Sequence, residues 1–181
     1  MKLLHTPTLA TSLSGKYLLL DSTTFISASK SDEFLSLLSS LVARGCSLMT
    51  IPSVVYEFTR NANYITGYNE RLEFIESLKV TVLQRVEEIL EKEQAFKIAY
   101  AKAFSSRKEK GPSYTDALLC TVAYKYRNNN MLLMTANHKD VPPSMFDRTE
   151  LITIDIKGDL RTEAIYSLSS TKLNKVIDSI A

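Results

Sequence analysis

The sequence predicts an α/β protein in which helices sandwich a mostly parallel sheet of roughly five strands. Short apolar runs, typical of strands buried on both faces, alternate with segments whose apolar residues recur at helical spacing. The chain has 181 residues, of which 45% are hydrophobic and 23% charged, and this fits one soluble-type domain. It contains only five Gly and five Pro, which leaves little room for linkers. We expect a lead-in over residues 1–15 and a single domain over 16–181.

The elements follow from local patterns taken in chain order. The expected strands cover residues 17–20, 46–51, 79–83, 131–135 and 151–154. The expected helices cover residues 32–44, 53–60, 66–78, 85–105, 114–126 and a C-terminal stretch from 171. Ser31 or Asp32 suits the N-cap of the first helix, Gly45 its end, and Ser113 the start of the helix at 114.

Charge and cysteine content exclude few functions. The net charge is +2 and the pI is about 8.4, which permits a nucleic-acid partner without requiring one. Cys46 and Cys120 show no metal-ligand spacing and lie among apolar residues, which indicates reduced core thiols. No apolar run approaches the roughly 20 residues of a membrane span, and no signal peptide is visible. We therefore expect a cytoplasmic protein with no membrane partner.

Four acidic residues stand at the ends or starts of these elements. Asp21 follows the first strand, and Glu57 lies early in the helix after the second strand. Asp116 lies in the first turn of the helix at 114, and Asp140 follows the fourth strand after a short loop. In open α/β sheets ligands bind beyond the carboxyl ends of the strands. If the strands before Asp21 and Asp140 are neighbours, this edge gathers the four carboxylates.

Each acid also has a structural interpretation. Asp21 begins Asp-Ser-Thr, a sequence that favours a turn or a helix cap. Asp116 follows Ser113 by three residues, the spacing of a capping box, and a helix start favours an acid there. Glu57 can lie on a helix surface, and Asp140 can open a turn before Val141-Pro142. The sequence leaves these alternatives open.

Gathered carboxylates call for a cation. They repel one another and raise one another's pKa unless a positive charge neutralises them. Mg²⁺ and Mn²⁺ prefer carboxylate oxygen and water and need few protein ligands. Two such ions can clamp the attacking and leaving oxygens of a phosphodiester displacement. The sequence therefore predicts Mg²⁺ or Mn²⁺ as cofactor.

Four segments together resemble the motifs of the PIN-domain nucleases, in the order in which that family has them. They read Tyr-Leu-Leu-Leu-Asp-Ser-Thr from Tyr17, Val-Val-Tyr-Glu from Val54, Ser-Tyr-Thr-Asp-Ala-Leu-Leu from Ser113, and Leu-Leu-Met-Thr-Ala-Asn-His-Lys-Asp from Leu132. The resemblance spans roughly residues 16–154, most of the chain. It implies a three-layer sandwich around a parallel sheet and a metal-dependent endoribonuclease with RNA as substrate.

The resemblance also assigns roles to single residues. Asp21, Glu57, Asp116 and Asp140 would hold the metal directly or through water, and the carboxylate cluster would be catalytic. Thr23 matches the small polar residue that orients a metal-bound water, Thr135 supplies a supporting hydroxyl, and Asn137 matches a position that is acidic in some relatives. Because many relatives are toxins of bacterial toxin–antitoxin pairs and often dimeric, an antitoxin partner and a homodimer are implied as well.

Phosphate binding is predicted for a basic group consisting of Arg60, Arg107, Lys108 and Lys110, for which a solvated loop is an equal alternative. A Rossmann-like dinucleotide enzyme is disfavoured, because no GxGxxG or P-loop follows any strand. The alternative function is a catalytically inactive PIN-like protein that binds RNA or acts as a scaffold.

Overall fold

The computed structural model, which describes residues 6–60, 62, 64–105 and 111–180, contains one mixed sheet of six strands. The strand order is β3-β2-β1-β4-β6-β5. Strands β1 to β4 form its parallel part and β5 and β6 its antiparallel part. The α/β class and the mostly parallel sheet are confirmed. The sheet has one strand more than the roughly five expected.

The parallel strands lie close to their predicted positions. Their bounds are β1 Tyr17–Leu20, β2 Ser47–Thr50, β3 Thr81–Val82 and β4 Met131–Thr135. Strand β1 pairs with β2 on one side and β4 on the other, with Leu20 opposite Met134. Leu18, Leu19 and Leu20 are fully buried, as a central strand covered on both faces requires. The carboxyl ends of β1 and β4 therefore lie side by side.

A long hairpin extends the sheet beyond β4. Its strands are β5 Phe146–Ile156 and β6 Asp159–Leu168, and β6 lies between β4 and β5. The prediction found only residues 151–154 of β5 and none of β6. The reason is that β6 carries charged and polar residues, including the fully buried Glu163, so its sequence lacks the apolar run of a buried strand.

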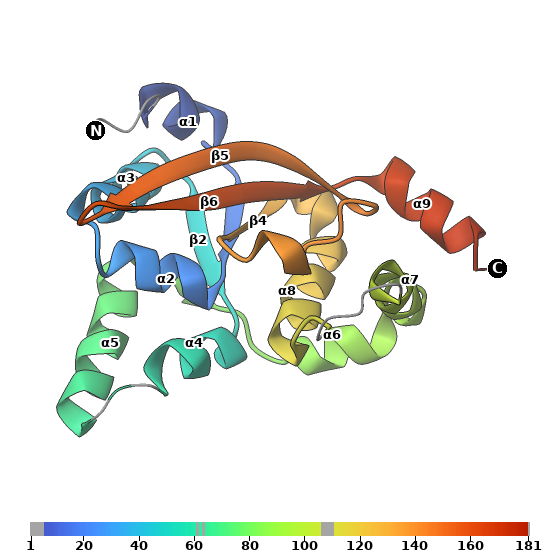
Figure 1. Cartoon of the computed structure of the whole chain (residues 1–181), viewed down its shortest axis with the longest axis horizontal. Coiled ribbons are helices and arrows are strands. Elements are labelled where there is room, and N and C mark those ends of the chain that lie inside the picture. Colours follow the sequence, from blue (N-terminus) through green and yellow to red (C-terminus); the bar gives the residue numbers. More distant parts are fainter. Residues whose placement is uncertain (1–5, 61, 63, 106–110, 181) are drawn as a thin grey trace.

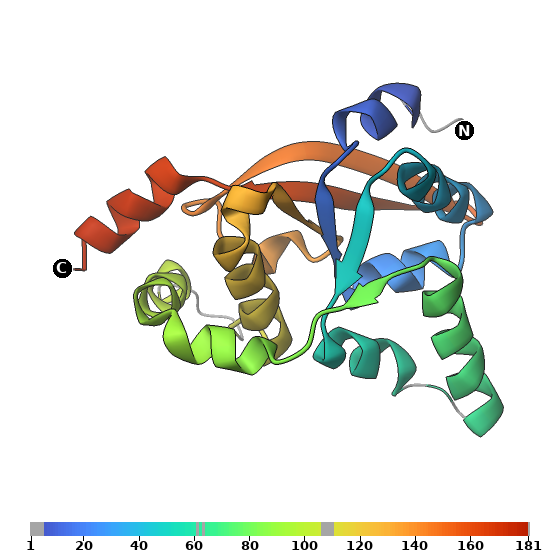
Figure 2. The same cartoon turned by 180° about the vertical axis from the view of Figure 1, so that it is seen from behind.

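The helices form two groups on opposite sides of the parallel strands, as the two opposite views in Figures 1 and 2 show. The first group comprises α2 Ser22–Ala28, α3 Asp32–Ala43, α4 Pro52–Thr59 and α5 Ile65–Ser77. The second comprises α6 Val86–Lys92, α7 Gln94–Phe104 and α8 Tyr114–Lys125. Two short 3₁₀ turns, η1 Arg127–Asn129 and η2 His138–Asp140, flank β4. Ser31 caps α3, and Gly45 follows it with a φ of 87° that suits glycine.

The helices differ from the prediction in three places: α2 Ser22–Ala28 was not expected, and residues 85–105 and the lead-in also differ. The single helix expected over residues 85–105 is broken at Glu93, whose ψ of 57° is not helical. This break lets α6 and α7 each pack against α8. The expected lead-in contains α1 Thr6–Ser12, and Leu9, Ala10 and Leu13 are buried in the core.

The C-terminal helix α9 Ser170–Asp178 packs against α7 of its own chain. Leu173 is its buried anchor, and Lys102 on α7 donates a hydrogen bond to the carbonyl of Ser179 at 3.0 Å. Among the described helices, none combines the length and apolar character needed to span a membrane.

Candidate functional site

The candidate site lies where β1 and β4 end. The backbone N–H of Asp21, the first residue after β1, donates to the carbonyl of Met134 in β4 at 3.1 Å. Thr135, the last residue of β4, donates its hydroxyl hydrogen to Asp21 Oδ2 at 2.7 Å. This edge is the one at which open α/β sheets bind ligands.

Asp21 is a helix cap and a site residue at once. Its Oδ1 accepts from the backbone N–H of Ser22 at 2.6 Å, which starts α2. Its Oδ2 accepts from Thr23 Oγ1 at 2.8 Å in addition to Thr135. Thr23 also accepts from the N–H of Ala136 at 3.1 Å, so its hydroxyl joins α2 to the loop after β4. Thr23 and Thr135 therefore both donate hydrogen bonds to the Asp21 carboxylate. Their support of a metal site stays a prediction.

Glu57 on α4 reaches the same network through one hydroxyl. Ser22 Oγ donates to Glu57 Oε2 at 3.0 Å, and Ser22 also lies next to Asp21. Glu57 is half-buried rather than solvated. Sequence reasoning did not single out Ser22, because an Asp-Ser-Thr run has too many turn and cap uses to reveal a bridge between two acids.

Asp140 lies in the loop after β4 and is contacted from that loop and from α7. Asn137 donates its side-chain amide to Asp140 Oδ2, and the Asn137 N–H in turn donates to Thr135 Oγ1 at 2.9 Å. The buried Tyr100 on α7 donates its hydroxyl hydrogen to the carbonyl of Asp140 at 3.0 Å. Tyr100 was missed as a supporting residue because in sequence it resembles any apolar position of a helix.

Asp116 has the capping role that the sequence offered as one interpretation, and its role as a site residue stays a prediction. It forms the capping box of α8, since Asp116 Oδ2 accepts from the N–H of Ser113 at 2.8 Å and Ser113 Oγ accepts from the N–H of Asp116 at 3.2 Å. Burial raises the pKa of Asp116, the hydrogen bonds from Ser113 oppose that effect, and the negative charges of Asp140 and Asp21 raise the pKa further. Two of the other predicted acids, Asp21 and Asp140, therefore lie near enough to affect the charge of Asp116.

Several of these residues line one cleft. We call it the acidic cleft, and the residues that line it are Asp116, Leu119, Cys120, Leu133, Thr135, Asn137, Asp140 and Val141. The space around it, about 200 Å³, includes open solvent, and its enclosed part has room for about one water. Asp21 is linked to the cleft because it accepts a hydrogen bond from Thr135, which lines it. Glu57 accepts a hydrogen bond from Ser22, whose hydroxyl also contacts Asp21.

Only one residue of the predicted basic group lies in the part of the chain that the structure describes. Arg60 is exposed at the end of α4. Arg107, Lys108 and Lys110 lie outside the described residues. Phosphate binding by these four residues stays a prediction.

Comparisons with known proteins identify no family. No family model and no curated protein matches the chain. One solved structure that matches is TrmN from Thermus thermophilus, a methyltransferase, with 10% sequence identity and a TM-score of 0.34. The match covers 91% of this chain and 47% of that one, so the chain spans about half the length of TrmN. A likeness this weak assigns neither a fold nor an activity.

The prediction of a metal-dependent endoribonuclease is wrong. Within the described ranges, no group of three or more His, Cys, Asp or Glu side chains is arranged to hold a metal ion, so the carboxylate cluster that a metal-dependent endoribonuclease requires is not assembled. The endoribonuclease, hydrolase and toxin–antitoxin assignments are therefore withdrawn. Asp21, Asp116 and Asp140 do share one edge of the sheet, with Glu57 one hydroxyl away.

Proposed function

We propose that the chain binds one divalent cation, Mg²⁺ or Mn²⁺, in the acidic cleft. The observation that carries this proposal is that two acidic residues, Asp116 and Asp140, line one cleft together with Asn137 and Thr135. Burial raises the pKa of Asp116 most, and the negative charges of Asp140 and Asp21 raise it further. A cation in the cleft would relieve the repulsion among these charges.

The donor set fits such an ion. Mg²⁺ keeps several waters and is usually bound through only one or two carboxylates, so it does not need a group of three acids. The cleft is small and opens to solvent, so water can fill the positions of a bound ion that the protein leaves open. The thiol of Cys120 is no competitor as a ligand, because burial raises its pKa and keeps it protonated.

The four acids would contribute unequally. Asp116 and Asp140 would contact the ion, and Asp21 and Glu57 would act through water and through the hydroxyls of Thr135 and Ser22. Coordination positions that the protein does not fill stay open to water or to a phosphate oxygen. RNA binding and a homodimer stay predictions, and no reaction is assigned to the bound ion.

We also propose that the fold is PIN-like, enlarged by the β5–β6 hairpin. What supports this is the arrangement of the four motifs, whose acids stand after strands or in the first turns of helices at one edge of a mostly parallel sheet. Helices on both sides of that sheet agree with a three-layer sandwich (Figures 1 and 2).

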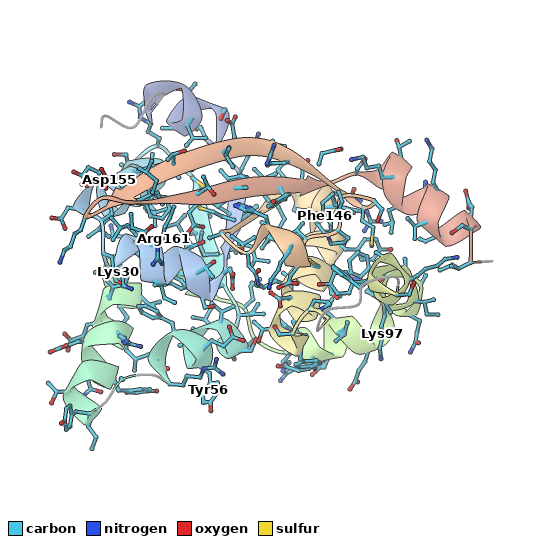
Figure 3. All side chains as sticks on the ribbon, in the orientation of Figure 1. Lys30, Tyr56, Lys97, Phe146, Asp155 and Arg161 are labelled. Carbon is cyan, nitrogen blue, oxygen red and sulfur yellow. The ribbon has the colours of Figure 1, made fainter. Side chains whose placement is uncertain are left out.

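The test of the cation site is isothermal titration calorimetry with MnCl₂ and MgCl₂. The wild type is expected to bind one cation, and the double variant Asp116→Asn, Asp140→Asn to bind it at least tenfold more weakly. The matched control is Asp155→Asn, Asp159→Asn, which removes two exposed acids next to the turn between β5 and β6. Asp155 is labelled in Figure 3. Equal affinities in the wild type and the cleft variant would refute the site.

A further inference from the structure

A fifth acid lies behind the site. Glu163 on β6 is completely buried, and both of its carboxyl oxygens are hydrogen-bonded to hydroxyls of α2. Oε1 accepts from Ser27 Oγ at 2.7 Å, and Oε2 contacts Thr24 Oγ1 at 2.9 Å. A carboxylate in such a place is costly when ionised, because two neutral hydroxyls replace water only in part.

Thr24 can serve two arrangements of protons. Its Oγ1 lies 2.9 Å from Glu163 Oε2 and 3.2 Å from the carbonyl of Met134, yet a hydroxyl has one hydrogen to donate. With Glu163 ionised, Thr24 donates to Glu163, and the Met134 carbonyl still accepts from the N–H of Asp21. With Glu163 protonated, the carboxyl donates to Thr24 and the Thr24 hydrogen turns to Met134. Both states satisfy every group, so the pocket tolerates either.

Glu163 and Asp21 lie on either side of the Met134 carbonyl. Thr24 in the first turn of α2 contacts this carbonyl through its hydroxyl, and the N-cap residue Asp21 contacts it through its backbone N–H. The charged groups that act on Glu163 are Asp21 and Arg161, which lies on β6 two residues before it (Figure 3). From β5 the residue opposite is Ile152, and α2 presents the hydroxyls of Ser27 and Thr24.

We propose that Glu163 exchanges a proton with solvent and couples that exchange to cation binding at the acidic cleft. In the balanced step the cation binds to Asp116 and Asp140 in the acidic cleft, Glu163 loses its proton, and the Thr24 hydrogen turns from Met134 to Glu163. The proton leaves to solvent. This inference rests on the proposed cation site and adds proton-linked regulation to it.

The sign of the coupling follows from the charges. Burial raises the pKa of Glu163 to about 7, the Ser27 and Thr24 hydrogen bonds oppose that shift, and the charge of Asp21 adds to it. A cation in the acidic cleft offsets the negative charge of Asp21 and lowers the pKa of Glu163, so a proton is released. By reciprocity, ionised Glu163 strengthens cation binding, and affinity rises with pH between about 6 and 8.

The test counts protons during Mn²⁺ binding. Calorimetry at pH 7 in two buffers of different ionisation enthalpy gives the number released. We expect the wild type to release up to about half a proton more than Glu163→Gln, since a group with a pKa near 7 is half protonated at that pH. The control is Glu150→Gln, an exposed acid on β5, which should match the wild type. Any proton released by Asp116 is common to all three and cancels.

A second measurement does not depend on how a variant folds. Carboxyl-carbon NMR of the wild type follows the titration of Glu163 with and without Mg²⁺, and we expect a lower pKa when Mg²⁺ is present. If Mn²⁺ binds but the wild type and Glu163→Gln release equal numbers of protons, the coupling is refuted and the cation site stands. If the wild type binds no cation, both are refuted.

Discussion

Asp116 combines a structural and a binding role in one side chain. Its carboxylate closes the capping box with Ser113 and also lines the acidic cleft. Asn retains an oxygen that accepts from the N–H of Ser113, but it carries no charge. We therefore expect Asp116→Asn to weaken Mn²⁺ binding at least tenfold. Calorimetry with Mn²⁺ checks this.

The same variant should leave the metal-free fold intact. Burial and the charges of Asp140 and Asp21 raise the pKa of Asp116, so the ionised form destabilises the folded state near neutral pH. Asp116→Asn should match or exceed the wild type in free energy of unfolding by urea at pH 7 without metal. Ser113→Ala is the contrasting variant, since losing the cap should cost about 1 kcal/mol. A large loss of stability in Asp116→Asn would show that Asp116 is only a cap.

Glu163 should make stability depend on pH. Its pKa is about 7 in the folded state against an ordinary 4.5, so between these values the folded protein holds a proton that the unfolded chain has released. The free energy of unfolding therefore falls as pH rises through this window, by about 3 kcal/mol at most. Urea unfolding at pH 5 and pH 8 should show the fall in the wild type and much less of it in Glu163→Gln. An equal fall in both would contradict the assignment.

Residues that could be predicted differ from those that could not by the signal they leave in sequence. Asp21 follows an apolar run, Asp116 follows a helix-cap signal and Asp140 follows a strand after a short loop, and such positions are visible in the sequence. Glu163, Ser22 and Tyr100 act through contacts between elements far apart in sequence. Nothing in their local pattern marks such contacts.

At the scale of elements, strands with continuous apolar runs were predicted best. Strand β4 has the predicted bounds because all five of its residues are apolar or small and all are buried. Strand β6 mixes exposed charges with a buried acid and has no readable period. The helix expected over residues 85–105 shows one continuous helical pattern, and only its packing against α8 reveals the break at Glu93.

Helix α9 offers a test of packing at this scale. Leu173 is its only fully buried side chain among the described residues of the helix, and it anchors α9 to the domain. Removing most of a buried Leu side chain typically costs about 2–5 kcal/mol. We expect Leu173→Ala to lose stability in that range by urea unfolding. Asn174→Ala, an exposed neighbour, should stay within about 0.5 kcal/mol. A loss below 1 kcal/mol for Leu173→Ala would mean that α9 docks weakly.

At the scale of the molecule, the acidic cleft joins the two groups of helices. Asp21 starts α2 in one group, Asp116 starts α8 in the other, and Asp140 lies in η2 between them. A cation held there would bind the folded state and not the unfolded chain. At a hundred times its Kd it should add about 2.7 kcal/mol to the free energy of unfolding.

Thermal unfolding measures this effect over the whole chain. The melting temperature should rise with Mn²⁺ concentration in the wild type and stay flat in Asp116→Asn, Asp140→Asn. Zero shift in the wild type at millimolar Mn²⁺ would count against the site. An equal shift in both proteins would place the ion elsewhere.

The most direct measurement is an anomalous difference map from crystals of the wild type soaked with Mn²⁺. The account predicts one peak in the acidic cleft, at about 2.0–2.2 Å from carboxylate oxygens of Asp116 and Asp140, with water in its remaining positions. A map from crystals soaked at saturating Mn²⁺ with an empty cleft, or with its peak on other residues, would contradict the account.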